Sequence, residues 1–196
     1  MKILILGAAA GGGLPQWNCG CDNCKEARLP TGVIKPQTQS SVAVSADGQN
    51  WALLNASPDL RQQLQSTPHL HPASLRHTPI STVLITNGDI DHVAGLLTLR
   101  EKQALNLTCT EHIHSVLAEN PIFAALDPQQ VKRVTIALNE TFEVAPGVLA
   151  QLYSVPGKIP LYKETPDGEI ETDLEGEQTV GVALKGNGKT AHYIPG

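Results

Sequence analysis

The chain has 196 residues, 41% hydrophobic and 17% charged, as expected for one globular domain with its own core. Its formal net charge is −5 and it contains no basic run, which argues against a nucleic-acid-binding protein. No apolar run approaches the roughly 20 residues that a membrane-spanning helix needs. The first residues, MKILILG followed by glycines, favour a strand and a turn over a signal peptide, so we expect a cytoplasmic protein.

Apolar periodicity and turn residues predict many strands separated by a few helices. In chain order, the predicted strands are 2–7, 41–45, 51–54, 80–86, 105–110, 131–138, 142–144, 148–155, 179–184 and 191–194. The predicted helices are 57–65, 91–103 and 111–119. Asp47-Gly48 and Asp167-Gly168 are predicted hairpin turns. This order indicates an α/β protein with a large, partly antiparallel sheet that is covered by helices.

Several segments have simple interpretations. The glycine-rich loop at 11–13 follows a strand but lacks the spacing of a dinucleotide-binding fingerprint. Ser57 is the predicted N-cap of the first helix, with Pro58 at its first position. Cys109 lies inside an apolar strand and is expected to be an inert core residue. The histidines of the loop 68–79, for which solvent exposure is expected, are His69, His71 and His77.

The predicted domain covers residues 1–196 as one unit, because the sequence contains no linker, repeat or low-complexity tract. Its last strand, 191–194, runs directly into Pro195-Gly196 with no helix to cover it. We interpret this ending as a chain from which the C-terminal part of the domain is missing.

Three of the four cysteines fall within six residues, in the sequence NCGCDNC that contains Cys19, Cys21 and Cys24. Disulfides between such close neighbours would be strained, and exposed free thiols are reactive. Zinc takes four thiolate or imidazole ligands, and two thiolates two residues apart can chelate one ion from a turn. The pattern therefore favours zinc over three free cysteines. The candidates for the fourth ligand are Asp22, a histidine of the loop 68–79 and a residue beyond Gly196.

The stretch ITNGDIDHVAGLL at 85–97 carries a second cluster of metal-ligating side chains. Asp89, Asp91 and His92 supply two carboxylates and one imidazole, a set that suits iron(II) or manganese better than a hydrolytic zinc pair. A two-histidine, one-carboxylate iron site would need another histidine. In the alternative interpretation, Asp89 or Asp91 caps the following helix and His92 packs beside it. For the turn in isolation, the cap is the better interpretation.

This stretch resembles the S/T-H-x-H-x-D-H signature of the metallo-β-lactamase superfamily. In that pattern, the histidines and the terminal Asp-His pair bind one or two metals at the edge of a β-sandwich. Thr86 holds the S/T place, and Asp91 and His92 match. Asn87 and Asp89 stand where the two other histidines would be.

The superfamily's second landmark, a strand followed by P-G-H, is also altered. Here Pro156-Gly157 is followed by Lys158, and a lysine ammonium is a poor metal ligand at neutral pH. The resemblance implies an αββα sandwich, while the exchanged ligands argue against a dinuclear zinc hydrolase. Together with the cysteine cluster, the superfamily order favours a ligand site at 89–92 over a simple helix cap.

The combination of NCGCDNC, NASPDLRQQL and TNGDIDHVAGLLTLRE resembles the PqqB family of pyrroloquinoline quinone (PQQ) synthesis proteins along the whole chain. The resemblance implies a structural Zn²⁺ on Cys19, Cys21 and Cys24, and it implies relatives that extend beyond Gly196. It also implies a role in making PQQ from a ribosomal peptide precursor that contains Glu and Tyr. Two activities follow from it: an iron-dependent hydroxylase of the tyrosine-derived part, and a carrier of PQQ to the periplasm.

The site residues are assigned on this basis. The residues expected to carry the chemistry and an active-site Fe²⁺ are Asp91 and His92, joined by Asp89. The residues expected to contact substrate are Asn87, Ser57, Asp59 and Lys158, and Arg61 is a further candidate anion partner. The expected partners are a small-molecule or peptide-derived PQQ precursor and other PQQ-pathway proteins, and the sequence leaves a homodimer open.

Overall fold

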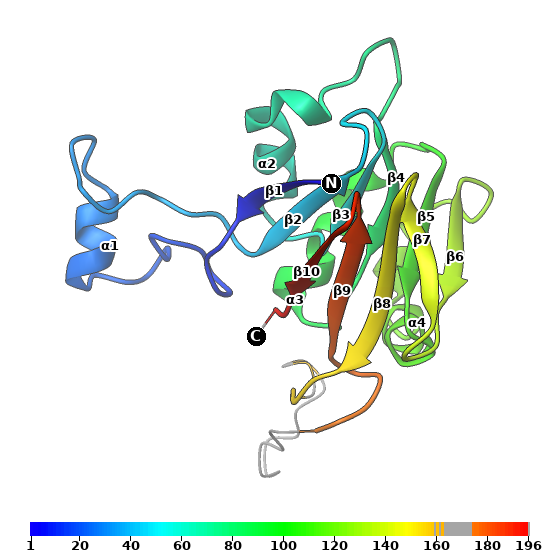
Figure 1. Cartoon of the computed structure of the whole chain (residues 1–196). Helices are drawn as coiled ribbons and strands as arrows, with labels where there is room; N and C mark the ends of the chain where they lie inside the picture. The colour runs from blue at the N-terminus through cyan, green and yellow to red at the C-terminus, as the bar shows by residue number, and fades with distance from the viewer. Residues whose placement is uncertain (159, 161, 163–173, 196) are drawn as a thin grey trace.

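The computed structural model describes residues 1–158, 160, 162 and 174–195, and its strands form two sheets (Figure 1). The first sheet has six strands in the order β1-β2-β3-β4-β5-β6. These strands are β1 (Lys2–Gly7), β2 (Ser41–Ser45), β3 (Trp51–Leu54), β4 (Ile80–Leu84), β5 (Leu105–Cys109) and β6 (Val131–Thr135). The pairs β1/β2 and β2/β3 are antiparallel, whereas β3 to β6 are parallel to one another.

The second sheet has four antiparallel strands in the order β10-β9-β8-β7. They are β7 (Thr141–Ala145), β8 (Val148–Ser154), β9 (Val180–Gly186) and β10 (Lys189–Tyr193). The hairpin turn predicted at Asp167-Gly168 lies outside the described residues. The expectation of one large sheet is therefore wrong, and the sandwich implied by the superfamily resemblance is confirmed.

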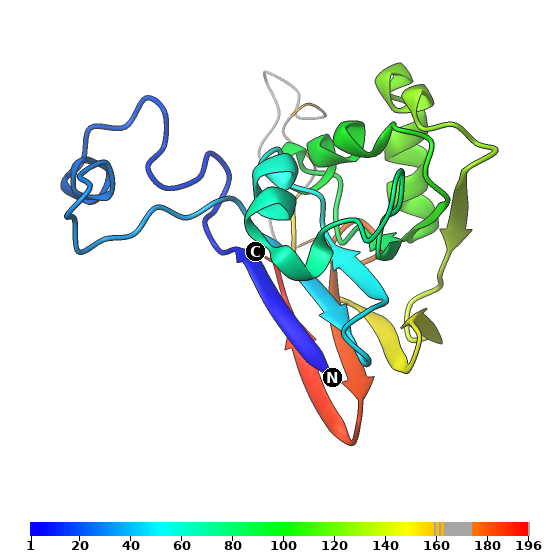
Figure 2. The same cartoon turned by 90° about the horizontal axis from the view of Figure 1, so that it is seen from above.

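The helical segments gather on the face of the six-stranded sheet that points away from the four-stranded sheet (Figure 2). The α-helices are α1 (Asp22–Ala27), α2 (Leu60–Ser66), α3 (Ile90–Val93) and α4 (Glu111–Ala118). The 3₁₀ segments are η1 (Pro68–Leu70), η2 (Ala94–Leu99) and η3 (Pro121–Ala125). Only α1 stands apart. It lies in the connection between β1 and β2, which projects from the sandwich in both views and is called the cysteine arm below (Figures 1 and 2). No helix in the part of the chain that the structure describes is long and apolar enough to cross a membrane.

The six-stranded sheet separates two apolar cores. Successive residues of β3 point to opposite faces, so Trp51 and Leu53 pack toward the helices while Ala52 and Leu54 pack toward the second sheet. All four side chains are fully buried. Burial on both faces explains why this strand is a continuous apolar run, as expected for a strand inside a sandwich that is covered by helices.

The segment predicted as one helix over 91–103 is short and irregular instead. It is the four-residue α3 followed by the 3₁₀ segment η2, which ends at Leu99. Gly95 donates its N–H to the carbonyl of Ala56 (2.8 Å), outside its own helix. A Cβ at Gly95 would lie 2.1 Å from Ser57 O, so only glycine permits this approach. The contact with the 56–57 backbone interrupts the helical hydrogen-bond ladder.

The start of α2 also differs from the prediction. The helix begins at Leu60, and Asp59 rather than Ser57 occupies its N-cap position. The Ser57 hydroxyl is fully buried and donates to Gln63 Oε1 (3.1 Å), so it does not cap the helix. The Ser57 side chain is thus committed to holding α2 against the segment that precedes it.

We expect Leu84→Ala to lower the free energy of unfolding by about 2–5 kcal/mol, because Leu84 is fully buried between the two sheets. Ile5→Ala, at a side chain that is 72% exposed, is the control and should change it by no more than about 0.5 kcal/mol. Urea unfolding measures both. Equal losses in the two variants would contradict the assignment of the inter-sheet core.

Candidate functional site

The turn that follows β4 lies where the two sheets meet. Val180 of β9 donates its N–H to Thr86 O (2.9 Å), and Asn87 pairs with Thr179 as an isolated antiparallel bridge. Both Thr86 and Asn87 are buried. These contacts anchor the turn to both sheets, and the start of α3 is therefore held at the edge of the sandwich.

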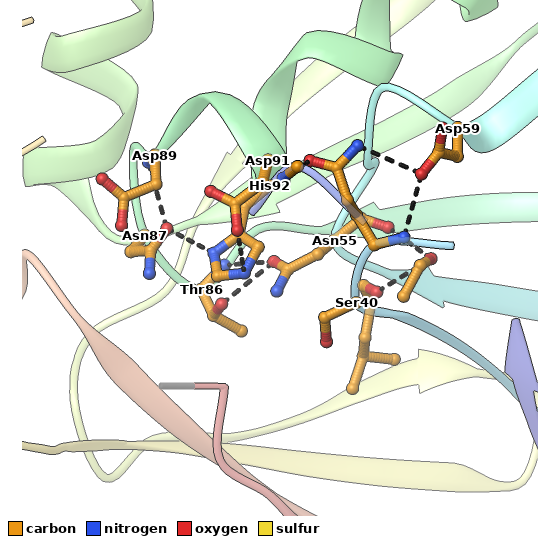
Figure 3. Close-up of polar contacts among 12 residues, drawn as sticks. Ser40, Asn55, Asp59, Thr86, Asn87, Asp89, Asp91 and His92 are labelled. Carbon is orange, nitrogen blue, oxygen red and sulfur yellow. Dashed lines mark hydrogen bonds and ion pairs between the residues drawn. The ribbon is translucent and has the colours of Figure 1, made fainter. Parts of the chain in front are cut away.

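Three side chains from this turn and from α3 converge at that edge (Figure 3). One ligand atom from each of Asp89, Asp91 and His92 lies within 4.8 Å of the others. His92 is buried, and the two carboxylates are partly exposed. Asp89 occupies the N-cap position of α3, but its side chain makes no capping hydrogen bond, so the capping interpretation fails for this residue.

Asn87 sets the orientation of the His92 ring. Its Oδ1 accepts the N–H of Asp89 (3.0 Å) and lies within hydrogen-bond distance of His92 Nδ1. An amide oxygen can only accept, so Nδ1 carries the proton and Nε2 keeps its lone pair. Nε2 lies 3.8 Å from Asp91 Oδ2.

Burial lowers the pKa of His92, and the nearby Asp91 carboxylate opposes this shift only in part. The ring is therefore neutral at pH 7, which is the form that binds a metal ion. Metal-binding histidines commonly donate their other ring N–H to an oxygen acceptor. Asn87 is this oxygen acceptor for His92, although it stands at the position of a histidine ligand in the superfamily pattern.

A buried amide that the sequence analysis missed supports the turn. Asn55 Oδ1 accepts from both the backbone N–H and the hydroxyl of Thr86 (3.0 Å each) (Figure 3). Its Nδ2 donates to the Tyr193 hydroxyl (3.2 Å). Asn55 itself has a φ of +60°, a conformation that asparagine tolerates better than most residues. The signal in the sequence was an asparagine directly after the apolar strand WALL.

Tyr193 connects this amide to the second sheet. Its hydroxyl also lies 2.8 Å from Ser40 Oγ, and burial raises the pKa of Tyr193, so the phenol stays neutral. These bonds join β10 to Ser40, which directly precedes β2, and to Asn55, which directly follows β3. Nothing in the local sequence around Tyr193 indicates this contact, because Ser40 and Asn55 are distant in the chain.

The two carboxylates of this group, Asp89 and Asp91, line a cavity of about 450 Å³, whereas His92 is buried behind them. The lining residues of this cavity are Gly11, Gly12, Gln39, Asp89, Ile90, Asp91 and Lys158. Lys158, from the altered second landmark, thus shares a cavity with the two carboxylates. A Cβ at Gly11 would lie 3.5 Å from Asp91 Oδ2, so the glycine loop lies directly beside the ligand group.

Asp59 acts on this cavity through Gln39. Its Oδ2 accepts from the backbone N–H (2.9 Å) and from Nε2 (3.0 Å) of Gln39, whose Oε1 accepts the N–H of Gly12 (3.0 Å). The structure thus places Asp59 behind the glycine loop, where it also lines a neighbouring pocket of about 250 Å³. Of the other residues predicted to contact substrate, Ser57 has a fully buried side chain and Arg61 is solvent-exposed.

The cysteine cluster forms a separate group on the projecting arm. The sulfur atoms of Cys19, Cys21 and Cys24 lie within 4.8 Å of one another. Hydrogen bonds from the Cys24 backbone and the neighbouring thiols lower the pKa of Cys21, which stands at the N-cap of α1. Three soft donors at this spacing fit a zinc ion with one further ligand.

The described residues do not add a fourth ligand to this group. Asp22 is exposed and pairs with Lys25 at 3.8 Å. His69, His71 and His77 are exposed, as predicted, on a different loop. Cys109 is fully buried, and burial raises its pKa far above the ordinary value, which confirms an inert core thiol.

Comparison with known proteins identifies the superfamily to which this chain belongs. Residues 50–196 match the model of the beta-lactamase superfamily domain, and the chain belongs to that superfamily. Within it, the chain is 54% identical over 196 residues to coenzyme PQQ synthesis protein B of Rhizobium meliloti (strain 1021), and 56% identical over 197 residues to that of Ruegeria pomeroyi. The resemblance to the PqqB family is thereby confirmed. The chain spans 64% and 65% of the length of these two relatives and is itself fully covered by both matches.

Solved structures of related proteins have the same fold. A crystal structure of Zn²⁺-bound PqqB from Methylobacterium extorquens superposes with a TM-score of 0.96 and 53% identity, covering 100% of this chain and 65% of that one. A diphosphatase of the PhnP family shares the fold at a TM-score of 0.60 and 22% identity, covering 89% of this chain and 61% of its own. The metallo-β-lactamase fold predicted from the two motifs is confirmed.

We expect Asn55→Ala to lower the free energy of unfolding by about 1–3 kcal/mol, because the buried Thr86 N–H loses its acceptor. Asn139→Ala is a matched control, since Asn139 has a similar φ of +65° but is exposed. Chemical unfolding measures both variants. If the two lose the same stability, the cost comes from the left-handed backbone and not from the bond to Thr86.

We expect Asn87→Ala to weaken divalent-metal binding at the Asp89, Asp91 and His92 group by roughly 10- to 100-fold, the usual effect of removing a hydrogen-bond partner of a ligand. The measurement is titration with Mn²⁺ or Fe²⁺ of protein in which the three cysteines are already saturated with Zn²⁺. Asn50→Ala, at an exposed asparagine, should leave the affinity unchanged. Unchanged affinity in Asn87→Ala would show that the ring needs no such support.

Proposed function

We propose that this protein takes part in PQQ biosynthesis as a metal-dependent hydroxylase of the tyrosine-derived part of the peptide precursor. The similarity to coenzyme PQQ synthesis protein B over the whole chain supports the pathway. The observation that carries the chemistry is the donor set of one neutral imidazole and two carboxylates at the edge of an open cavity. Oxygen-rich sets with a single imidazole suit Fe²⁺ better than a hydrolytic zinc pair.

The chain's own residues have distinct tasks in this proposal. Asp91, His92 and Asp89 would hold the metal ion, and Asn87 keeps the Nε2 lone pair of His92 directed toward it. Lys158, which lines the same cavity, would bind a carboxylate of the substrate. When bound, Fe²⁺ would supply the redox chemistry that activation of O₂ requires.

The exchanged landmark residues support this choice over zinc-dependent hydrolysis. Asn87 is engaged with His92 and Asp89, and Lys158 brings an ammonium group to the cavity where the superfamily pattern has a ligand. A second metal next to that ammonium would be repelled. We therefore propose one active-site metal and a separate structural zinc on the cysteine arm.

A carrier of PQQ or its precursor is the second candidate, and one observation favours it. The cavity is about 450 Å³ in volume, within the range of small-molecule sites, and Lys158 offers a cation to a polycarboxylate. A carrier would use the cavity and Lys158 but would not need the donor set of Asp89, Asp91 and His92.

The test uses protein loaded anaerobically with Fe²⁺ and then mixed with the precursor, O₂ and ascorbate. Hydroxylation inserts one oxygen atom into a C–H bond and reduces the other to water, with two electrons from the substrate and two from ascorbate. Mass spectrometry should detect substrate that has gained one oxygen atom. An Asp91→Ala, His92→Ala double variant should lose this product, whereas His69→Ala, at an exposed histidine, should keep it.

No gain of oxygen by the substrate would contradict the hydroxylase. PQQ binding of unchanged affinity in the same double variant, measured by calorimetry, would then support the carrier. Retention of the hydroxylated product in the double variant would place the chemistry elsewhere in the protein.

A further inference from the structure

One side chain connects the loop and the helix of the cysteine arm. Arg28 follows α1, and its guanidinium donates to three backbone carbonyls: Nη1 to Cys19 O (2.8 Å) and Cys24 O (3.2 Å), and Nη2 to Gln16 O (2.7 Å). Two of these carbonyls belong to members of the cysteine triad. The same guanidinium therefore fixes the backbone positions of the first and the third cysteine relative to each other.

The middle cysteine is held by the helix itself. Cys21 stands at the N-cap of α1, and its carbonyl accepts the N–H of Lys25 (2.9 Å). Arg28 lies at the other end of the same helix, where it is the C-cap residue. The helix and the arginine together fix the backbone at all three cysteines.

This local bonding matters because the arm has almost no apolar core. The clusters of buried residues on either side of the six-stranded sheet contain no residue of α1, and Trp17 and Val33 of the arm are 86% and 87% exposed. Within α1, only Cys24 and Ala27 are buried. With so little packing to order the loop, binding a metal would cost the conformational entropy of fixing it. Hydrogen bonds that order the loop beforehand reduce that cost and raise the affinity.

We propose that Arg28 is a positioning residue that preorganises Cys19, Cys21 and Cys24 for a thiolate-bound metal ion. The inference rests on the proposed zinc site at these cysteines. Arg28 acts through backbone carbonyls and does not touch the metal. The role requires a planar fork with several donors, which arginine has and lysine lacks.

The test compares Zn²⁺ affinities by competition with a chromophoric chelator. Arg28→Gln should bind Zn²⁺ roughly 10-fold more weakly, the lower end of the usual range for such partners, because the contacts are close to solvent. Arg28→Lys should lose about as much, since one ammonium cannot span three carbonyls. Lys25→Gln is the matched control and should bind as the parent does, because it removes a positive charge from the same helix without removing these bonds.

Cobalt substitution supplies a second readout. The thiolate-to-Co²⁺ absorption reports how many cysteines bind, and in Arg28→Gln it should saturate only at higher Co²⁺ concentration. The melting temperature of the sandwich should be unchanged in the Arg28 and Lys25 variants, because neither apolar core contains a residue of α1.

Three outcomes would overturn the proposal or its basis. Parent-like affinity in Arg28→Gln would show that the loop needs no such support. Parent-like affinity in Arg28→Lys with a loss in Arg28→Gln would assign the effect to charge rather than to positioning. A Cys19→Ser, Cys21→Ser, Cys24→Ser variant that binds Zn²⁺ as the parent does would refute the zinc site itself.

Discussion

The candidate active site depends on the bond between one buried amide and one peptide group, Asn55 Oδ1 with Thr86 N–H. Thr86 lies two residues beyond the end of β4, and its buried N–H is bonded to the Asn55 side chain. An unpaired N–H at this depth would cost about 1–3 kcal/mol. Asn55 removes that cost and at the same time contacts the Thr86 hydroxyl and Tyr193 of the second sheet. The two sheets and the turn of the candidate site thus meet at one side chain.

The exchanged histidine at Asn87 has a physical explanation in this arrangement. A histidine there would add a ligand, whereas the asparagine amide accepts from His92 Nδ1 and from the Asp89 N–H. One ligand is lost, and the remaining imidazole gains a fixed ring orientation and a fixed tautomer. The second exchange, to Lys158, adds a positive charge to the same cavity. In the proposed function, the two exchanges act in the same direction, because each disfavours a pair of metal ions and the second favours an anionic ligand.

Much of the fold could be predicted because its strands have strong local patterns. β3 is apolar throughout and buried on both faces, and β2 and β3 are joined at the predicted Asp47-Gly48 turn. The division into two sheets could not be derived from those patterns, because β7 to β10 look locally like further strands of one sheet. The irregular helix after Asp91 was missed for a related reason. Its cause is the close approach of Gly95 to the Ala56 backbone, a tertiary contact.

The candidate site divides in the same way. Asp89, Asp91 and His92 are neighbours in sequence, so a motif could identify them and the turn brings them together. Ser57 and Asp59 were assigned to substrate by their position in a loop, but the structure shows that Ser57 is buried and that Asp59 acts through Gln39. Asn55 and Tyr193 could not be paired from the sequence, because 138 residues separate them. Local patterns identify candidate ligands, whereas the residues that orient them come from distant parts of the chain.

The two clusters are stabilised by different means, and this difference bears on how each would respond to a metal ion. The Asp89, Asp91 and His92 group lies in the chain between Ile85 and Val93 of the helix-side core, and its turn is bonded to Val180 of the inter-sheet core. Burial of these neighbours orders the turn whether or not an ion is bound. The cysteine arm has no comparable packing and depends on Arg28 and on the backbone bonds of α1. Metal binding to the arm would thus be coupled to local ordering, whereas binding at the sheet edge would use a group that folding has already brought together. This contrast in packing favours a structural metal ion on the arm and an exchangeable metal ion at the sheet edge.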